Sequence, residues 1–357
     1  MTSRSKELRR EKRLLPIKPS LRKKSAYYLK LCALLGLLRV FSACAPAPEF
    51  EVPNTAGMRW FKGNTHTHTT MSDGDSPPEV VAHWYKERGY RFLVLSDHNV
   101  FTDPATLSAL QDSAFLLIPG EEVTAKFRDK PVHVNGLNVP GVIAPQSDST
   151  LVGTIQKNVD AIRSVNAVPH INHPNFRWAF NHRELLRVRN DKLLEIFNGH
   201  PRVHNFGGGG WPSMEQVWDH LLSAGKRVYG IAVDDAHHFQ GEFAAERLNP
   251  GKGWVVVKAR ALEASAILES LEAGLFYAST GVVLQEIAIA SRSFTIHIQP
   301  QDDFKYRTEF IGAHGRVLHV SENNPAIFGL RAHESYVRAK VTDSSGRAAW
   351  VQPVFMK

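Results

Sequence analysis

Short apolar runs that end in polar residues recur along the chain from Trp60 onward. They cover residues 92–95, 115–118, 132–139, 167–169, 193–197 and 228–233, and most are followed by Ser, Asp, Glu, Asn or His. Short apolar runs bounded by turn residues are typical of buried parallel strands. The pattern therefore predicts a set of strands with polar side chains at their ends.

Segments with helical features lie between these runs. We expect helices over residues 104–113, 149–165, 213–224 and 262–273. Ser76 can cap a further helix that begins with two prolines and ends at Gly89. Alternating strands and helices indicate an α/β barrel or an open α/β sheet, in which the active site lies at the carboxyl ends of the strands.

The pattern changes after residue 285. Residues 293–298, 317–320, 326–330, 336–341 and 348–354 have the pattern of short strands separated by turns, which predicts a small antiparallel β domain over residues 286–357. The glycines at 207–210 form the only low-complexity stretch and predict a mobile loop.

The chain of 357 residues has a formal net charge of +8, but the excess lies at its N-terminus. Residues 1–43 carry twelve Lys or Arg and two Glu, so the remaining residues have a net charge of −2. A groove that follows a nucleic-acid backbone needs clustered basic residues. We therefore expect no nucleic-acid partner for the residues after 43.

The basic N-terminus has the form of an export signal. Basic residues precede the apolar residues 31–38 and a few small residues before Cys44. The apolar run is far shorter than the ~20 residues of a membrane span. We predict a signal segment at 1–43, a Pro-rich linker at 44–58, and export to the periplasm or membrane attachment through a lipidated Cys44. The alternative is a disordered N-terminus on a cytoplasmic protein.

The body of the chain is rich in histidine and has no cysteine after Cys44, so any metal ligands there must be His, Asp or Glu. His66 and His68 share one side of an extended strand, and Asp73 follows in a turn. Further His and carboxylate residues recur near predicted strand ends, namely His98, Glu122, His133, His173, Asp235 and His237. Independent core histidines would have no reason to gather there, so the pattern indicates a metal site.

Several of these motifs together resemble a known family. Residues 63–74, 95–99, 120–122, 173–175 and 235–237 resemble, in order, the motifs of the polymerase and histidinol phosphatase (PHP) superfamily of metal-dependent phosphoesterases. The resemblance covers residues 59–285 and implies a PHP domain there, with a distorted (β/α)7-type barrel. Residues 60–64, 89–93, 336–338 and 350–353 further resemble the subfamily that includes carbaryl hydrolase, which cleaves a carbamate ester.

The resemblance implies a site for three metal ions. The first would be held by His66, His68, Glu122 and Asp235, the second by Glu122, His133 and His173, and the third by Asp73, His98 and His237. Such a set without sulfur suits Zn, Mn or Fe. Three neighbours compete for these places: Glu121 with Glu122, His170 with His173, and Asp234 with Asp235. The motif spacing favours the second of each pair, and it directs His238 away from the site.

Other residues are expected to support catalysis or bind substrate. Asp97 can orient a histidine or a metal-bound water, or be a simple turn residue. Glu195 and Asn198 match the family's Glu-x-x-Asn and are expected to support the site, with Glu195 a catalytic candidate. The substrate-binding candidates Arg177, His200 and Arg202 can equally be solvated loop residues. The aromatic residues Trp178, Phe206 and Trp211 can line a pocket or belong to the core.

The function expected from these residues is hydrolysis of a small phosphoester by a metal-bound hydroxide, which classes the chain as a phosphoric ester hydrolase. The alternative is a carboxylic or carbamate ester hydrolase with the same metal site. A third interpretation is an exported binding protein with structural metals, which a nine-ligand set disfavours, because structural sites rarely need more than four ligands.

Overall fold

The computed structural model describes residues 48–330 and 334–357. The predicted signal segment, Cys44 and the start of the linker lie outside the described residues. Residues 48–357 form one compact unit. Among the described helices, none has the length and apolar character needed to cross a membrane.

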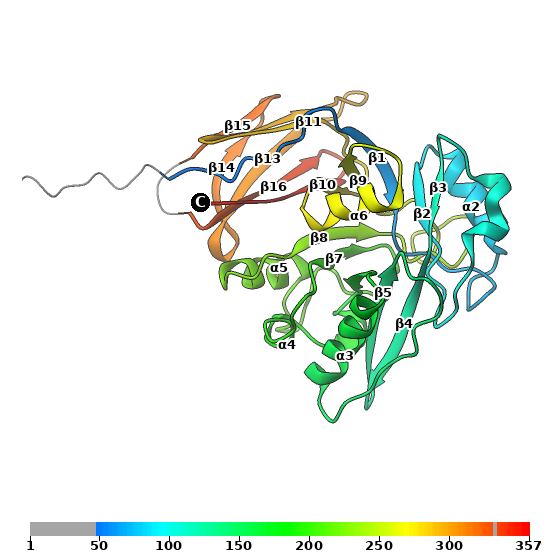
Figure 1. Cartoon of the computed structure of the whole chain (residues 1–357). Helices are drawn as coiled ribbons and strands as arrows, with labels where there is room; N and C mark the ends of the chain where they lie inside the picture. Colours follow the sequence, from blue (N-terminus) through cyan, green and yellow to red (C-terminus); the bar gives the residue numbers. More distant parts are fainter. Residues whose placement is uncertain (1–47, 331–333) are drawn as a thin grey trace, which may run out of the picture. The chain divides into compact units, whose positions relative to one another are not determined.

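The largest sheet has nine strands, in the order β14-β13-β16-β17-β10-β9-β1-β2-β3 (Figure 1). Its strands are β1 (Arg59–Asn64), β2 (Phe92–Val94), β3 (Leu116–Ile118), β9 (Trp254–Ala259), β10 (Phe276–Ser279), β13 (Tyr306–Gly312), β14 (Arg316–Ser321), β16 (Tyr336–Asp343) and β17 (Ala348–Phe355). Strands from both halves of the chain therefore share one sheet.

Two further sheets complete the β structure. A five-stranded sheet contains β4 (Gly120–Phe127), β5 (Lys130–Leu137), β6 (Val168–Ile171), β7 (Leu193–Asn198) and β8 (Tyr229–Val233) in sequence order. A three-stranded sheet has the order β11 (Leu284–Ala290), β12 (Ser293–Ile298) and β15 (Ala326–Gly329). The described strands thus form a mixed α/β fold with several sheets and no closed barrel, so the α/β class is confirmed and the (β/α)7 barrel is not shown.

The predicted parallel pairing holds for only part of these strands. β1, β2 and β3 are parallel, as are β6, β7 and β8. The prediction of a parallel strand at residues 132–139 is wrong, because β5 is antiparallel to both β4 and β6. Only two residues separate β4 from β5, whereas a parallel connection needs a crossover of a dozen or more.

Two isolated parallel bridges bring the sheets together where the polar residues lie. One bridge joins His98, after β2, to Glu122 in β4, and the other joins Thr67, after β1, to Ala236, after β8. The ends of strands from the nine-stranded and five-stranded sheets therefore meet at one place. Residues far apart in the chain become neighbours there.

Short helices connect the strands and cover the sheets. They are α2 (Pro78–Glu87), α3 (Leu151–Ser164), α4 (His182–Leu185), α5 (Met214–Ser223) and α6 (Ala264–Glu272), with 3-10 turns η1 (Pro104–Leu110), η2 (Phe176–Trp178) and η3 (Ala313–Gly315). The predicted cap of α2 is wrong: Pro77 is the N-cap, and the Ser76 hydroxyl donates to Asp75 instead. Of the segment predicted as a helix at 104–113, only Pro104–Leu110 is helical, and it forms a 3-10 helix.

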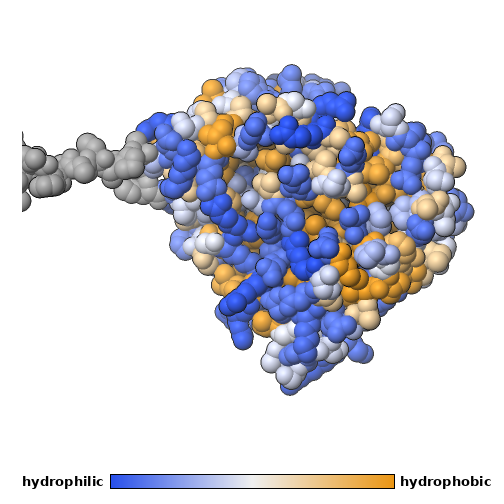
Figure 2. Space-filling model, viewed as in Figure 1, coloured by the Kyte–Doolittle hydropathy of each residue, from blue (hydrophilic) through white to orange (hydrophobic). Residues whose placement is uncertain are grey.

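The hydrophobic core lies between these helices and the sheets. On α3, Ile155, Val159 and Ile162 are buried, and α5 buries the fully enclosed Trp218 against the same cluster. Figure 2 shows that hydrophilic and hydrophobic residues are interspersed on the outer face seen in Figure 1. The short apolar runs of the sequence therefore form the interior, and the polar residues that follow them are available for a functional site.

The strands predicted after residue 285 are present, and two further strands, β11 and β13, accompany them. Four of these C-terminal strands, β13, β14, β16 and β17, continue the nine-stranded sheet through the pairing of β17 with β10. The predicted domain boundary falls within β11. The division into a PHP domain and a small β domain stays a prediction.

Candidate metal centre

All nine predicted metal ligands come together where the strand ends meet. They are His66, His68 and Asp73 after β1, His98 after β2, Glu122 in β4, His133 in β5, His173 after β6, and Asp235 and His237 after β8. These residues form four overlapping groups, one of which also includes Glu195. Within each group, the ligand atoms lie within 4.8 Å of one another. Sequence positions up to 171 residues apart therefore contribute to one centre.

Glu122 lies at the middle of the centre and is fully buried. Its Oε1 is 2.8 Å from His133 Nδ1 and 3.3 Å from His173 Nε2. Its Oε2 is 2.8 Å from His98 Nδ1. One carboxylate thus contacts imidazoles from three different segments, as a bridging ligand would.

Asp235 forms the second focus. Its Oδ1 is 3.4 Å from His66 Nε2 and 3.2 Å from His68 Nε2, and these two ring nitrogens are 3.1 Å apart. The backbone of Asp235 has φ 48°, in the left-handed region. This turn of the chain directly after β8 directs Asp235, rather than Asp234, toward the histidines.

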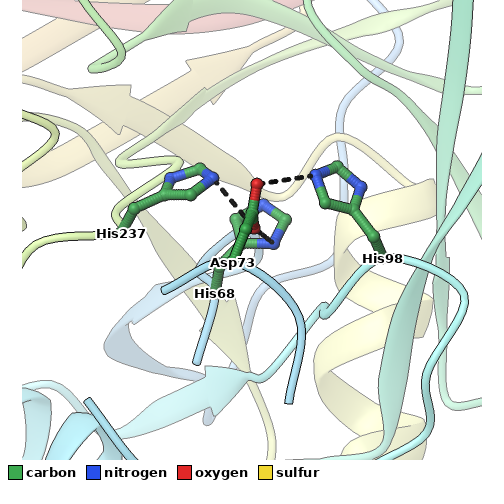
Figure 3. Close-up of side chains that lie close together, drawn as sticks. All are labelled: His68, Asp73, His98 and His237. Carbon is green, nitrogen blue, oxygen red and sulfur yellow. Dashed lines mark ion pairs between the residues drawn. The ribbon is translucent and has the colours of Figure 1, made fainter. Parts of the chain in front are cut away.

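Asp73 marks the more open side of the centre, since 56% of its side chain is exposed. Its carboxylate lies 3.3 Å from His237 Nε2 and 3.6 Å from His98 Nε2, with His68 3.7 Å away (Figure 3). His68 therefore contacts both Asp73 and Asp235. The observed groups do not divide into the three predicted sets, and the number of ions stays a prediction.

The two central carboxyl groups are ionised. Burial alone would raise the pKa of Glu122 and of Asp235, but the surrounding imidazoles hold each pKa well below its ordinary value. Conversely, burial lowers the pKa of His98, but the Glu122 carboxylate outweighs it and raises this pKa to about 9. Buried anions need compensating cations, which are either imidazolium protons or metal ions.

The tautomer of His66 provides a test of metal fit. Its Nδ1 is 2.7 Å from Glu195 Oε1, and because a carboxylate accepts, Nδ1 carries the proton. In the neutral ring, Nε2 then presents a lone pair to the oxygens of Glu122 and Asp235, which are also acceptors. Hydrogen-bond acceptors that face one another suit a cation between them. A histidine that donates its other ring N–H to a carboxylate, as His66 does, is also usual at metal sites. The residues present therefore fit divalent metal ions.

Glu195 and three polar residues that sequence reasoning missed surround these ligands. Besides His66, Glu195 accepts from the main-chain N–H of His173 and from Asn198 Nδ2, both at 2.8 Å. The missed residues are Asn135, Asn172 and Thr124: Asn172 Nδ2 donates to Glu122 Oε1 at 2.8 Å, Asn135 Oδ1 accepts from Asn172, and Thr124 Oγ1 is 2.6 Å from His98 Nδ1. Asn172 directly precedes a ligand, which is the one signal that could have identified it.

The competing neighbours of the ligands point elsewhere. Glu121 accepts from the Ile143 N–H, and burial raises its pKa to about 7. Asp234 accepts from the Tyr85 hydroxyl at 2.8 Å. His170 Nε2 lies 3.3 Å from Glu195 rather than among the ligands. His238 Nδ1 accepts from the Leu248 N–H at 3.4 Å, away from the centre as expected.

Asp97 contacts the loop after His68 rather than a ligand. Its carboxylate accepts from the Thr69 N–H and hydroxyl at 2.8 Å and from the Ser72 hydroxyl at 2.6 Å. Ser72 Oγ is in turn 3.4 Å from His68 Nδ1. The predicted orientation of a histidine is thus indirect, because Asp97 acts through this loop.

The substrate-binding candidates differ in exposure. His200 is half-buried, with its ring centroid 5.9 Å from that of His237, and burial lowers its pKa to about 4. Arg177 and Arg202 are exposed. Trp178 stacks on His204 with centroids 4.3 Å apart, Trp211 donates to Asn175, and Phe206 is 83% exposed, so Phe206 is not a core residue.

Fold and site together define a mixed α/β protein with a buried His, Asp and Glu centre suited to divalent metal ions. No family model matches the chain. Among curated proteins it is similar to the 5'-3' exoribonuclease Rnm of Salmonella typhimurium, with 35% identity over 77 residues, and to that of Escherichia coli, with 34% identity over 79 residues. Each match covers 21% of this chain and 26% of the relative, so the chain matches about a quarter of their length.

The chain is also similar, at low TM-scores, to solved structures of proteins described as PHP-like or metal-dependent phosphoesterases. A two-domain protein from Bacteroides vulgatus with a predicted PHP-like domain has 16% identity and a TM-score of 0.48, covering 87% of this chain and 99% of the other. A proposed metal-dependent phosphoesterase from Bifidobacterium adolescentis has 13% identity and a TM-score of 0.40, covering 56% and 94%. The resemblance to the PHP superfamily rests on the sequence motifs, and the carbaryl hydrolase subfamily stays a prediction.

Proposed function

We propose that this chain is a metal-dependent hydrolase that cleaves phosphoesters. The observation that carries the proposal is the convergence of nine His, Asp and Glu side chains, among them the ionised carboxylates of Glu122 and Asp235. Divalent ions, when bound by these residues, supply Lewis acidity and lower the pKa of a coordinated water.

The protein's own groups prepare this centre for hydrolysis. Glu195 keeps the proton of His66 on Nδ1, and Asn172 orients Glu122. In the reaction, the oxygen of water forms a bond to phosphorus, the ester P–O bond breaks, and the leaving alcohol takes up a proton. The exposed Asp73 marks the side from which a substrate can approach.

A screen of metal-loaded protein tests the reaction class. The substrates are p-nitrophenyl phosphate, bis-p-nitrophenyl phosphate, p-nitrophenyl acetate and 1-naphthyl carbamate. We expect hydrolysis of at least one of the two phosphoesters, abolished in Asp235→Asn and retained in His238→Gln. Activity confined to the last two substrates would instead establish a carboxylic or carbamate ester hydrolase with the same site.

RNA is a second candidate substrate, because the curated relatives matched over 77–79 residues are 5'-3' exoribonucleases. The net charge of −2 after residue 43 opposes it, since RNA backbones bind clustered basic residues. A 5'-labelled RNA oligonucleotide added to the screen decides the point. Stepwise shortening that depends on Asp235 would establish the nuclease.

A further inference from the structure

A cavity of about 560 Å³ opens beside the metal centre, at the end of β7. We call it the ring pocket; its lining includes Asn198, His200, Pro201, Val203, Phe206 and Lys252. Asn198 Nδ2 also lies 3.0 Å from Asp235 Oδ2, and the ring of His200 lies 5.9 Å from that of His237. Two lining residues therefore adjoin the metal centre, and the volume falls in the range of small-molecule sites.

The wall formed by Phe206 is the distinctive part of the ring pocket. Phe206 is 83% exposed, the highest value among the large apolar side chains that are exposed in the described residues. Single exposed apolar side chains are ordinary on protein surfaces. This one, however, lines a cavity that adjoins a candidate catalytic centre, so its unburied ring is available to a ligand.

The loop that carries Phe206 is held firmly at its base. Asn175 Nδ2 donates to the carbonyl oxygens of His204 and Pro212 at 2.8 and 3.0 Å, and Asn205 Nδ2 donates to Asn198 O at 2.8 Å. The four glycines that follow Phe206 all have positive φ, which a side chain would strain. These contacts hold both ends of the loop on which the exposed Phe206 lies.

His200 adds a polar group to the ring pocket. Its Nδ1 accepts from the main-chain N–H of Arg202 at 3.0 Å. In the neutral ring this contact places the proton on Nε2, so His200 can donate a hydrogen bond from that atom. An aromatic face and a fixed donor in one cavity suit a flat ring with polar substituents.

We propose that the ring pocket binds an aromatic ring in the alcohol part of the phosphoester, with Phe206 stacking on the ring and His200 donating to a polar atom attached to it. This proposal rests on the proposed phosphoesterase function and names its substrate class. The phosphoryl group lies at the metal centre, and the ring-bearing alcohol extends toward the glycine loop.

A pair of matched substrates tests the pocket. 2-Phenylethyl phosphate and n-butyl phosphate have leaving alcohols of similar basicity, and only the first carries a flat ring. We expect wild type to prefer 2-phenylethyl phosphate in kcat/KM. Phe206→Ala should lose about five- to tenfold on it and less than about twofold on n-butyl phosphate, because an aromatic pair contributes on that order. Phe206→Trp should keep the preference.

Ile327→Ala, which changes another exposed apolar residue on a different sheet, is the control and should change neither substrate. Equal effects of Phe206→Ala on both substrates, or no effect, would overturn the proposal. The affinities of 2-phenylethylphosphonate and n-butylphosphonate for metal-loaded protein, measured by calorimetry, give a readout without turnover. A ring preference that Phe206→Ala removes supports the ring pocket even where no phosphoester is hydrolysed, and its absence contradicts the pocket.

Discussion

Glu195 illustrates how one buried residue sets the chemistry of its neighbours. It is 1% exposed and contacts His66, the main-chain N–H of His173 and Asn198. Burial raises the pKa of Glu195, but the imidazoles of His66 and His170 outweigh this effect and hold it below its ordinary value. The carboxylate therefore stays ionised and fixes which nitrogen of His66 faces the centre.

Glu195→Gln should weaken metal binding with little loss of fold. The amide removes the negative charge. With its oxygen still accepting from the His173 N–H and Asn198, its NH2 group faces His66 Nδ1, so the proton of His66 is no longer held on that nitrogen. Changes of this kind lower metal affinity by about 10- to 100-fold. Metal titration against a competing chelator measures the effect, and the exposed Glu269→Gln is the control. Unchanged affinity would contradict the role assigned to Glu195.

His68 and His238 provide a second comparison at the residue scale. His68 contacts both Asp73 and Asp235, whereas His238 accepts from the Leu248 N–H. His68→Ala should therefore lower metal content and activity together, and His238→Ala should leave both within about twofold of wild type. Elemental analysis and the phosphoester assay measure the two effects. Equal losses would contradict the orientation of residues 235–238.

At the scale of elements, an ion pair connects α5 to the nine-stranded sheet. Arg338 of β16 is 2% exposed, and its Nε and Nη2 donate to Asp219 of α5 at 2.7 Å. The Tyr336 hydroxyl donates to the same carboxylate at 3.2 Å. Because α5 also packs on the five-stranded sheet, this pair ties the two sheets together.

Arg338→Met should lower the free energy of unfolding by about 3–5 kcal/mol, because it leaves Asp219 buried without its partner. Urea denaturation followed by circular dichroism measures this change. Arg307→Met is the matched control, since Arg307 pairs with Glu309 but is 54% exposed, and its loss should cost about 1 kcal/mol or less. A cost for Arg338→Met as small as that of the control would show that the pair does not stabilise the fold.

Helices and strands were predictable where the local sequence carried a strong signal, such as a capping residue. α3 and α5 lie within their predicted ranges because Thr150 and Ser213 cap their first turns. The antiparallel hairpin of β4 and β5 was missed because its turn uses Arg128, at φ 57°, and lacks the glycine or asparagine that usually marks such a turn.

At the scale of the whole molecule, the metal centre forms only in the folded chain. Its candidate ligands lie in or after strands of two different sheets, which meet through the bridges His98–Glu122 and Thr67–Ala236. An unfolded chain holds these side chains far apart. Metal ions should therefore bind the native state and stabilise it by mass action.

Removal of metal should lower the melting temperature of the full chain. Metal at 100 times its dissociation constant stabilises the native state by about 2.7 kcal/mol, which corresponds to several degrees. Scanning calorimetry before and after EDTA, with metal added back, measures the shift. An Asp235→Ala variant should show a smaller shift, and an equal melting temperature with and without metal in wild type would contradict the metal centre.

The sequence by itself identified the nine candidate ligands, because the motifs that resemble the PHP superfamily are local patterns of residues: His66 and His68 both follow β1, and Asp235 and His237 both follow β8. The tertiary structure alone decided how these groups meet. The antiparallel β5, the sheet shared by N- and C-terminal strands, the place of Asn172 beside Glu122, and the cavity that Phe206 shares with His200 depend on contacts between distant segments. Such contacts leave no local pattern, because their free energy arises only when the chain is folded.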